Sequence, residues 1–75
     1  MTKDEIEKAE KFREAAHRRI RNVETTLRRV RSLSNPASYR YTEEEVDRIF
    51  DHLQSLLDHT RQSFLQTRGH DHFSF

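Results

Sequence analysis

Hydrophobic residues recur every three or four positions through most of this chain, in two runs separated by one interruption. In the first run, the steps from Ala16 to Val30 are 4, 3, 4 and 3 residues, which is the heptad spacing of a packing seam. Polar residues fill the positions between. The run therefore predicts one long amphipathic helix with a single apolar face. The apolar positions of this helix are Ile6, Ala9, Phe12, Ala16, Ile20, Val23, Leu27, Val30 and Leu33.

The second run has a wider apolar stripe, with adjacent apolar pairs at residues 49/50, 56/57 and 64/65. This stripe is broader than one facing helix can cover, and soluble monomers rarely expose large contiguous apolar patches. If the two helices form a hairpin, we therefore expect it either to dimerise into a four-helix bundle or to dock on another protein. The predicted partner-binding residues of this helix are Ile49, Phe50, Leu56, Leu57 and Phe64.

The interruption between the two runs carries the signals that end one helix and start the next. Pro36 cannot sit inside a helix and disfavours the helical conformation of the residue before it. Thr42 and Glu45 have the spacing of a capping box, and Thr2 and Glu5 have the same spacing at the start of the chain. The sequence thus predicts an all-α fold, an antiparallel two-helix hairpin of the coiled-coil type within residues 1–68. The predicted boundaries are a helix at 3–33, a turn at 34–42 and a helix at 43–66.

Residues 69–75 show no apolar periodicity. Gly69 is placed to cap the second helix, and residues 69–75 are expected to form a flexible tail. His70 and His72 are of metal-ligating type but belong to this tail, and His52 and His59 are two helical turns apart, too far to share one ion. We therefore expect no metal site and no cofactor.

Composition agrees with long, exposed helices, because 36% of the 75 residues are charged, 32% are hydrophobic, and Gly and Pro occur once each. A chain of this length is near the lower limit for a self-sufficient core, so a partner is expected. Cysteine is absent, and there is neither a signal-peptide pattern nor an apolar run long enough to span a bilayer. We expect a soluble protein with a cytoplasmic location and no small-molecule substrate.

Charge is unevenly distributed although the net charge is only +1. Residues 17–41 hold seven arginines and one glutamate, a net charge of +6, whereas residues 42–75 hold three arginines and seven acids, a net charge of −4. At 100° per residue, several cations of the first helix point away from its apolar face, as in helices that contact phosphates. The alternative is that they balance the acidic start of the second helix and the helix dipole. The candidate nucleic-acid-binding residues are Lys11, Arg18, Arg21, Arg28 and Arg29.

Two further groups of residues are candidates for function, the tyrosines at 39 and 41 and the acidic residues at 43–47. Tyr39 and Tyr41 either fold over the end of the core or form an exposed aromatic tip of the kind found in binding hot spots, and we include them among the partner-binding candidates. The acidic residues at 43–47 are explained by helix capping, and two helices cannot build a water-excluding pocket. We therefore expect no enzymatic activity and no catalytic residues.

The segments Leu33-Ser34-Asn35 and Tyr39 to Leu53, with the pattern YxYTxExVxxIFxxL, resemble short helical-hairpin proteins carried by bacterial phages and mobile elements. The resemblance covers about a third of the chain and supplies no catalytic residues. It implies action by binding, and small phage proteins of this kind include inhibitors of host machinery such as CRISPR effectors. The sequence therefore favours a non-enzymatic protein that acts by protein–protein association, with self-association expected. The alternative is a protein that binds nucleic acid or a nucleoprotein.

Overall fold

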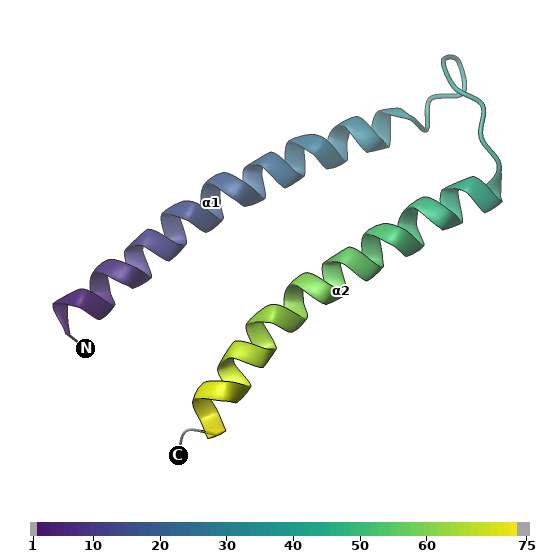
Figure 1. The fold of residues 1–75 in the computed structure, drawn as a ribbon. Helices are drawn as coiled ribbons and strands as arrows, with labels where there is room; N and C mark the ends of the chain where they lie inside the picture. Colours follow the sequence, from purple (N-terminus) through teal and green to yellow (C-terminus); the bar gives the residue numbers. More distant parts are fainter. Residues whose placement is uncertain (1, 74–75) are drawn as a thin grey trace. The chain divides into compact units, whose positions relative to one another are not determined.

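The structure is a computed structural model that describes the backbone of residues 2–73 and the side chains of residues 2–67. Within this range it consists of two helices, α1 (Lys3–Ser32) and α2 (Glu43–Phe73), joined by one connection (Figure 1). The chain divides into two units, Met1–Tyr39 and Arg40–Phe75, with one helix in each. The predicted all-α class and the two-helix organisation of a hairpin are confirmed.

Helix α1 begins where the capping signal predicts. The Thr2 hydroxyl accepts a hydrogen bond from the backbone N–H of Glu5 at 3.2 Å, so one of the first four unpaired N–H groups is satisfied. Asp4 and Glu5 lie in the first turn, where negative charge suits the positive end of the helix dipole. The helix ends at Ser32, with Leu33 as its C-cap.

The connection is held by hydrogen bonds between near neighbours. The side-chain oxygen of Asn35 accepts from the backbone N–H of Ala37 at 3.1 Å, which forms an Asx turn across Pro36. The backbone oxygen of Asn35 accepts from the N–H groups of Ser38 and Tyr39 at 3.2 and 3.0 Å. Because these bonds are local, the turn does not depend on contacts with the rest of the chain.

Helix α2 begins with a complete capping box. The backbone N–H of Glu45 donates to the Thr42 hydroxyl at 3.1 Å, and the Glu45 carboxylate accepts from the backbone N–H of Thr42 at 2.9 Å. The predicted start of the second helix at Glu43 is therefore confirmed.

The other end of α2 differs from the prediction. The helix continues through Gly69 to Phe73, whereas the sequence pattern predicted its end at Gln66. A glycine inside a helix costs only about 1 kcal/mol relative to alanine, which the hydrogen bonds of a continuing helix can outweigh. The predicted boundary is therefore wrong. Residues 74 and 75 of the expected tail lie outside the described residues.

The capping box gives a prediction about stability. Replacing Thr42 with alanine should lower the free energy of unfolding by about 1 kcal/mol, because the Glu45 N–H loses its acceptor. The measurement is urea unfolding followed by circular dichroism at a single protein concentration.

Thr26→Ala is the matched control, because the same atoms are removed inside α1, where the Thr26 hydroxyl donates to the backbone oxygen of Asn22 at 2.9 Å. Alanine is the better helix former there, so this variant should be as stable as the parent or more so. An equal loss in both variants would contradict a specific role for the cap.

Candidate binding surfaces

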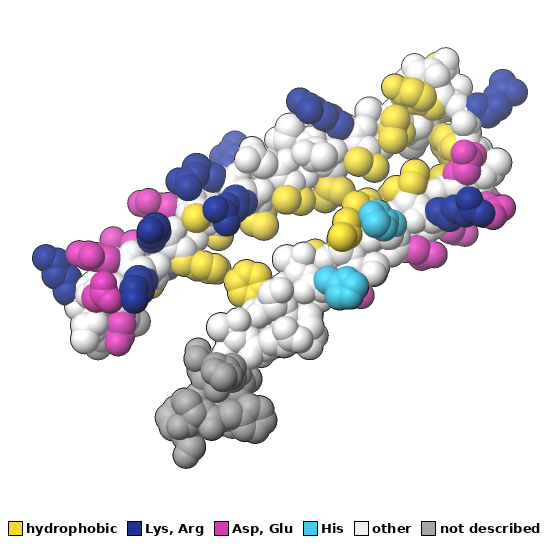
Figure 2. All heavy atoms as spheres, viewed as in Figure 1, with side chains coloured by type: hydrophobic (Ala, Val, Ile, Leu, Met, Phe, Trp, Pro, Cys, Tyr) yellow, Lys and Arg dark blue, Asp and Glu magenta, His cyan; other side chains and the backbone are white. Residues whose placement is uncertain are grey.

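The apolar face of α1 is open along its whole length. Apolar side chains follow one edge of this helix (Figure 2), and none of them is buried. Ala9, Ala16 and Val30 are the half-buried members of the face, while the larger side chains keep 45–58% of their surface exposed up to Leu27. The surface is hollowed beside Ala16. Its lining residues are Phe12, Arg13, Ala16, His17, Ile20, Arg21 and Glu24.

The apolar stripe of α2 is wide. Taking Leu53 as the reference and 100° per residue, Ile49 and Leu56 lie about 40–60° to one side, and Phe50 and Leu57 lie about 40–60° to the other. Leu57 is 62% exposed and Ile49 is 41% exposed. The stripe therefore spans roughly 120° of the helix surface, wider than an a/d coiled-coil seam. The five predicted contact residues, Ile49, Phe50, Leu56, Leu57 and Phe64, are all exposed, each on this stripe.

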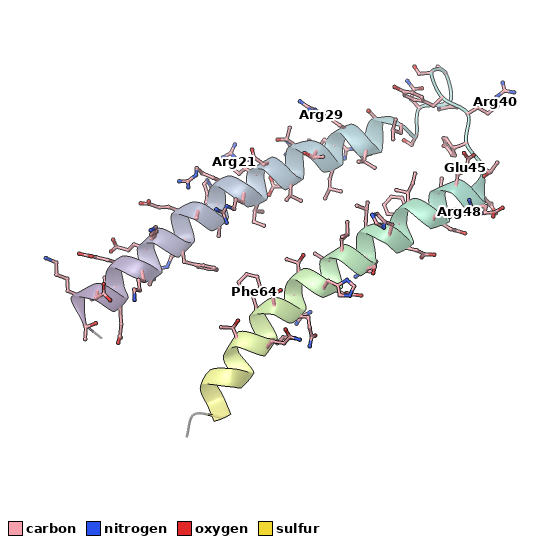
Figure 3. All side chains as sticks on the ribbon, in the orientation of Figure 1. Arg21, Arg29, Arg40, Glu45, Arg48 and Phe64 are labelled. Atoms are coloured by element: carbon pink, nitrogen blue, oxygen red, sulfur yellow. The ribbon has the colours of Figure 1, made fainter. Side chains whose placement is uncertain are left out.

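Tyr39 and Tyr41 lie in the connection on either side of Arg40. They are 50% and 47% exposed, and Arg40 is exposed as well and extends away from the backbone (Figure 3). Aromatic rings with a neighbouring guanidinium supply contact area and hydrogen-bond donors together, which is typical of binding hot spots.

Six of the arginines of α1 form two clusters with the same pattern, in which two arginines and a β-branched apolar residue precede a third arginine. Residues 18–21 read Arg-Arg-Ile-Arg and residues 28–31 read Arg-Arg-Val-Arg, ten positions further along. This short repeat has a spacing of ten residues, and apolar periodicity does not reveal it because most of its members are charged. All six arginines are exposed, and Figure 3 shows Arg21 and Arg29 extending from one side of the helix.

These arginines have few carboxylate partners. Within the described part of the chain, Arg28 is the member of the six that makes an ion pair, with Glu24 at 3.9 Å. Two other ion pairs lie outside the clusters, Lys8 with Asp4 at 3.2 Å and Arg48 with Glu44 at 2.7 Å. The candidates Lys11, Arg18, Arg21 and Arg29 make none among the described residues. Most of the positive charge of α1 is therefore not neutralised within the helix.

The helix dipole accounts for part of this charge distribution. Arg29 and Arg31 lie in the last turn of α1, and Glu43, Glu44 and Glu45 lie in the first turn of α2, so each group complements the end of its own helix. The effect falls off within one turn. It therefore explains the second arginine cluster but not the first, which lies in the middle of α1.

His17, His52 and His59 are the histidines whose side chains the structure describes. No group of three or more metal-ligating side chains occurs among the side chains that the structure describes. His52 and His59 are both exposed on α2. The side chains of His70 and His72 lie outside the described residues, as does that of Asp71.

No protein-family model matches the chain, and neither a curated protein nor a solved structure matches it. The resemblance to phage-borne hairpins stays a prediction. Neither described helix contains a stretch that is long and apolar enough to cross a bilayer. The candidate surfaces are apolar on one face of each helix and cationic on another face of α1.

The ion pairs give a second prediction about stability. Glu24→Gln should lower the free energy of unfolding by less than about 0.5 kcal/mol, because the pair with Arg28 is long and exposed. Glu44→Gln should cost more, about 0.5–1 kcal/mol, because it removes both the 2.7 Å pair with Arg48 and a negative charge from the first turn of α2. Urea unfolding at matched protein concentration measures both variants, and a larger cost for Glu24→Gln would refute this ranking.

Proposed function

We propose that this protein is a small, non-enzymatic binding protein that acts by protein–protein association, with a second copy of the chain as its first partner. The observation that carries the proposal is the exposure of the apolar residues. No side chain among residues 2–67 is buried, and the large apolar side chains keep between 39% and 62% of their surface in solvent. Helices with such faces are stable in water only when the faces are covered.

The amount of apolar surface indicates how association is built. Full burial of a large apolar side chain contributes about 1.5–3 kcal/mol, so covering the exposed half of the five α2 contact residues contributes roughly 5 kcal/mol per chain, or roughly 10 kcal/mol for two copies. Association costs on the order of 4–15 kcal/mol. The α2 stripe alone is therefore marginal, and we infer that the apolar face of α1 contributes to the same assembly.

Charge supports contacts between α1 and α2 rather than between two copies of α1. At 100° per residue, Arg19 and Arg31 lie about 60° to either side of the apolar face of α1, whereas α2 has a net negative charge. Opposite charges along the flanks of packed helices select the partner and its orientation. Two hairpins that share their apolar faces in this way would form a four-helix bundle. The tyrosines of the connection and the outer surface of the bundle remain for a further protein target.

The resemblance to phage-borne hairpins suggests what such a target is. A protein encoded by a mobile element acts on host machinery, and a CRISPR effector is one example. This part of the proposal rests on the resemblance of two segments, Leu33 to Asn35 and Tyr39 to Leu53.

Solution mass tests the proposal. Light scattering behind a sizing column should give a multiple of 9.1 kDa that does not decrease as salt is raised, because apolar burial strengthens or stays constant with salt. The double variant Phe50→Gln, Leu57→Gln should move the protein toward the monomer mass, since both residues lie on the same edge of the α2 stripe.

Ser55→Gln is the control, because Ser55 lies on the opposite side of α2 from Leu53, about 160° away. This variant should keep the parent mass. A parent protein that is monomeric at every concentration, or a double variant with unchanged mass, would overturn the proposal.

A further inference from the structure

The arginines of α1 occupy one sector of the helix, opposite its apolar face. With Arg18 as the reference and 100° per residue, Arg21, Arg28 and Arg29 fall within about 100° of one another, and the centre of this sector lies roughly 180° from the centre of the apolar face. A partner helix on the apolar face would therefore leave the sector open to solvent. We call these four residues, Arg18, Arg21, Arg28 and Arg29, the arginine sector.

Neither ion pairing nor the helix dipole explains the whole sector. Arg28 alone among its members has a carboxylate partner in the described part of the chain, at the long distance of 3.9 Å. Arg18 and Arg21 are too far from the C-terminus of α1 for the dipole to favour them. Further arginines lie between Arg18 and Arg28. Glu24 is the one acid in residues 17–41. Such a concentration of unneutralised charge favours binding of a polyanion.

We propose that the arginine sector binds the phosphates of double-stranded DNA. Arg21 and Arg28 lie along one edge of the sector, and Arg18 and Arg29 lie along the other. Between the edges is Thr25, a short, uncharged residue whose hydroxyl donates to the backbone oxygen of Arg21 at 3.0 Å. An α-helix with its side chains is about 10–12 Å across and enters a major groove about 12 Å wide. The two edges would then face the phosphates of the two strands.

The sector is confined to the second half of α1. Lys11 shares the orientation of Arg18 and Arg29, but Glu7 and Glu14 share the sector with it. These carboxylates would oppose phosphates at that end of the helix. From Arg18 to Arg29 the helix rises about 16 Å, which is enough to contact several phosphates along each strand.

Other polyanions fit the same residues less well. Single strands are bound by stacking of bases on aromatic rings, and residues 18–31, which hold the arginine sector, contain no aromatic side chain. An anionic membrane would require the apolar face of α1 to enter the lipid, which turns the arginine sector away from the headgroups. The major groove of duplex RNA is deep and too narrow to admit side chains to its bases.

Fluorescence anisotropy with a labelled, mixed-sequence DNA duplex of about two helical turns tests the proposal. Neutralising four phosphates per chain predicts a slope of about −3.6 for log affinity against log salt, so affinity should fall roughly 10²-fold between about 50 and 200 mM salt. The matching single strand, a duplex RNA and a phosphatidylserine vesicle should each bind more weakly. Equal or tighter binding of any of the three would overturn the assignment to duplex DNA.

Two quadruple variants locate the site. Arg18→Gln, Arg21→Gln, Arg28→Gln, Arg29→Gln removes the sector, and we expect at least a tenfold loss of affinity at about 50 mM salt and a much shallower salt slope. Lys3→Gln, Lys8→Gln, Arg48→Gln, Arg61→Gln removes the same four charges outside the sector. This control should keep the slope of the parent, and an equal loss in both variants would refute a located site.

The DNA-binding test and the solution-mass test can fail independently. The arginine sector contains none of the apolar residues assigned to the assembly, so its removal should leave both the helical circular dichroism and the solution mass unchanged. A DNA-binding parent that is monomeric would retain this inference and remove the proposed self-association. A parent protein that associates but does not bind the duplex would retain the proposed self-association and remove this inference.

Discussion

Burial of apolar surface is the constraint on which this protein depends. A helix of 30 residues gains little from intrinsic propensity and needs contacts along its length. Each helix has the apolar face that such contacts require, and no described side chain is buried among residues 2–67. If the proposed association covers these faces, the stability of the chain is coupled to association and to protein concentration.

Local interactions determine where the helices begin and end. Thr2 and Thr42 each accept a hydrogen bond from an N–H three residues later, and Asn35 accepts one across Pro36. None of these bonds needs a distant part of the chain. The helix boundaries are therefore encoded by neighbouring residues. In the proposed association, the partner would have to cover the apolar faces but would not have to define the ends of the helices.

The geometry of α1 separates two kinds of surface. A period of 3.6 residues puts the positions of the heptad seam on one side and the arginine sector on the other. Apolar contacts on one side and electrostatic contacts on the other respond in opposite ways to salt. The same helix can therefore belong to an assembly and still present positive charge to a polyanion. This separation makes the two proposals independent in solution.

The sequence by itself determined the all-α class, the two helices and three of their four ends to within one residue, because apolar period, capping boxes and Pro36 act over a few positions. It also indicated which side chains would be exposed, since Phe50, Leu57 and Phe64 belong to an apolar stripe that is wider than one facing helix can cover. The structure decided those features for which two alternatives have similar free energies, namely the choice of an ion-pair partner and the end of a helix. Glu24 has arginines three residues before it and four after it, and it pairs with Arg28, the arrangement in which the acid precedes the base by four positions. Helix α2 likewise continues through Gly69 to Phe73, because the cost of one glycine is smaller than the gain from continued backbone hydrogen bonding.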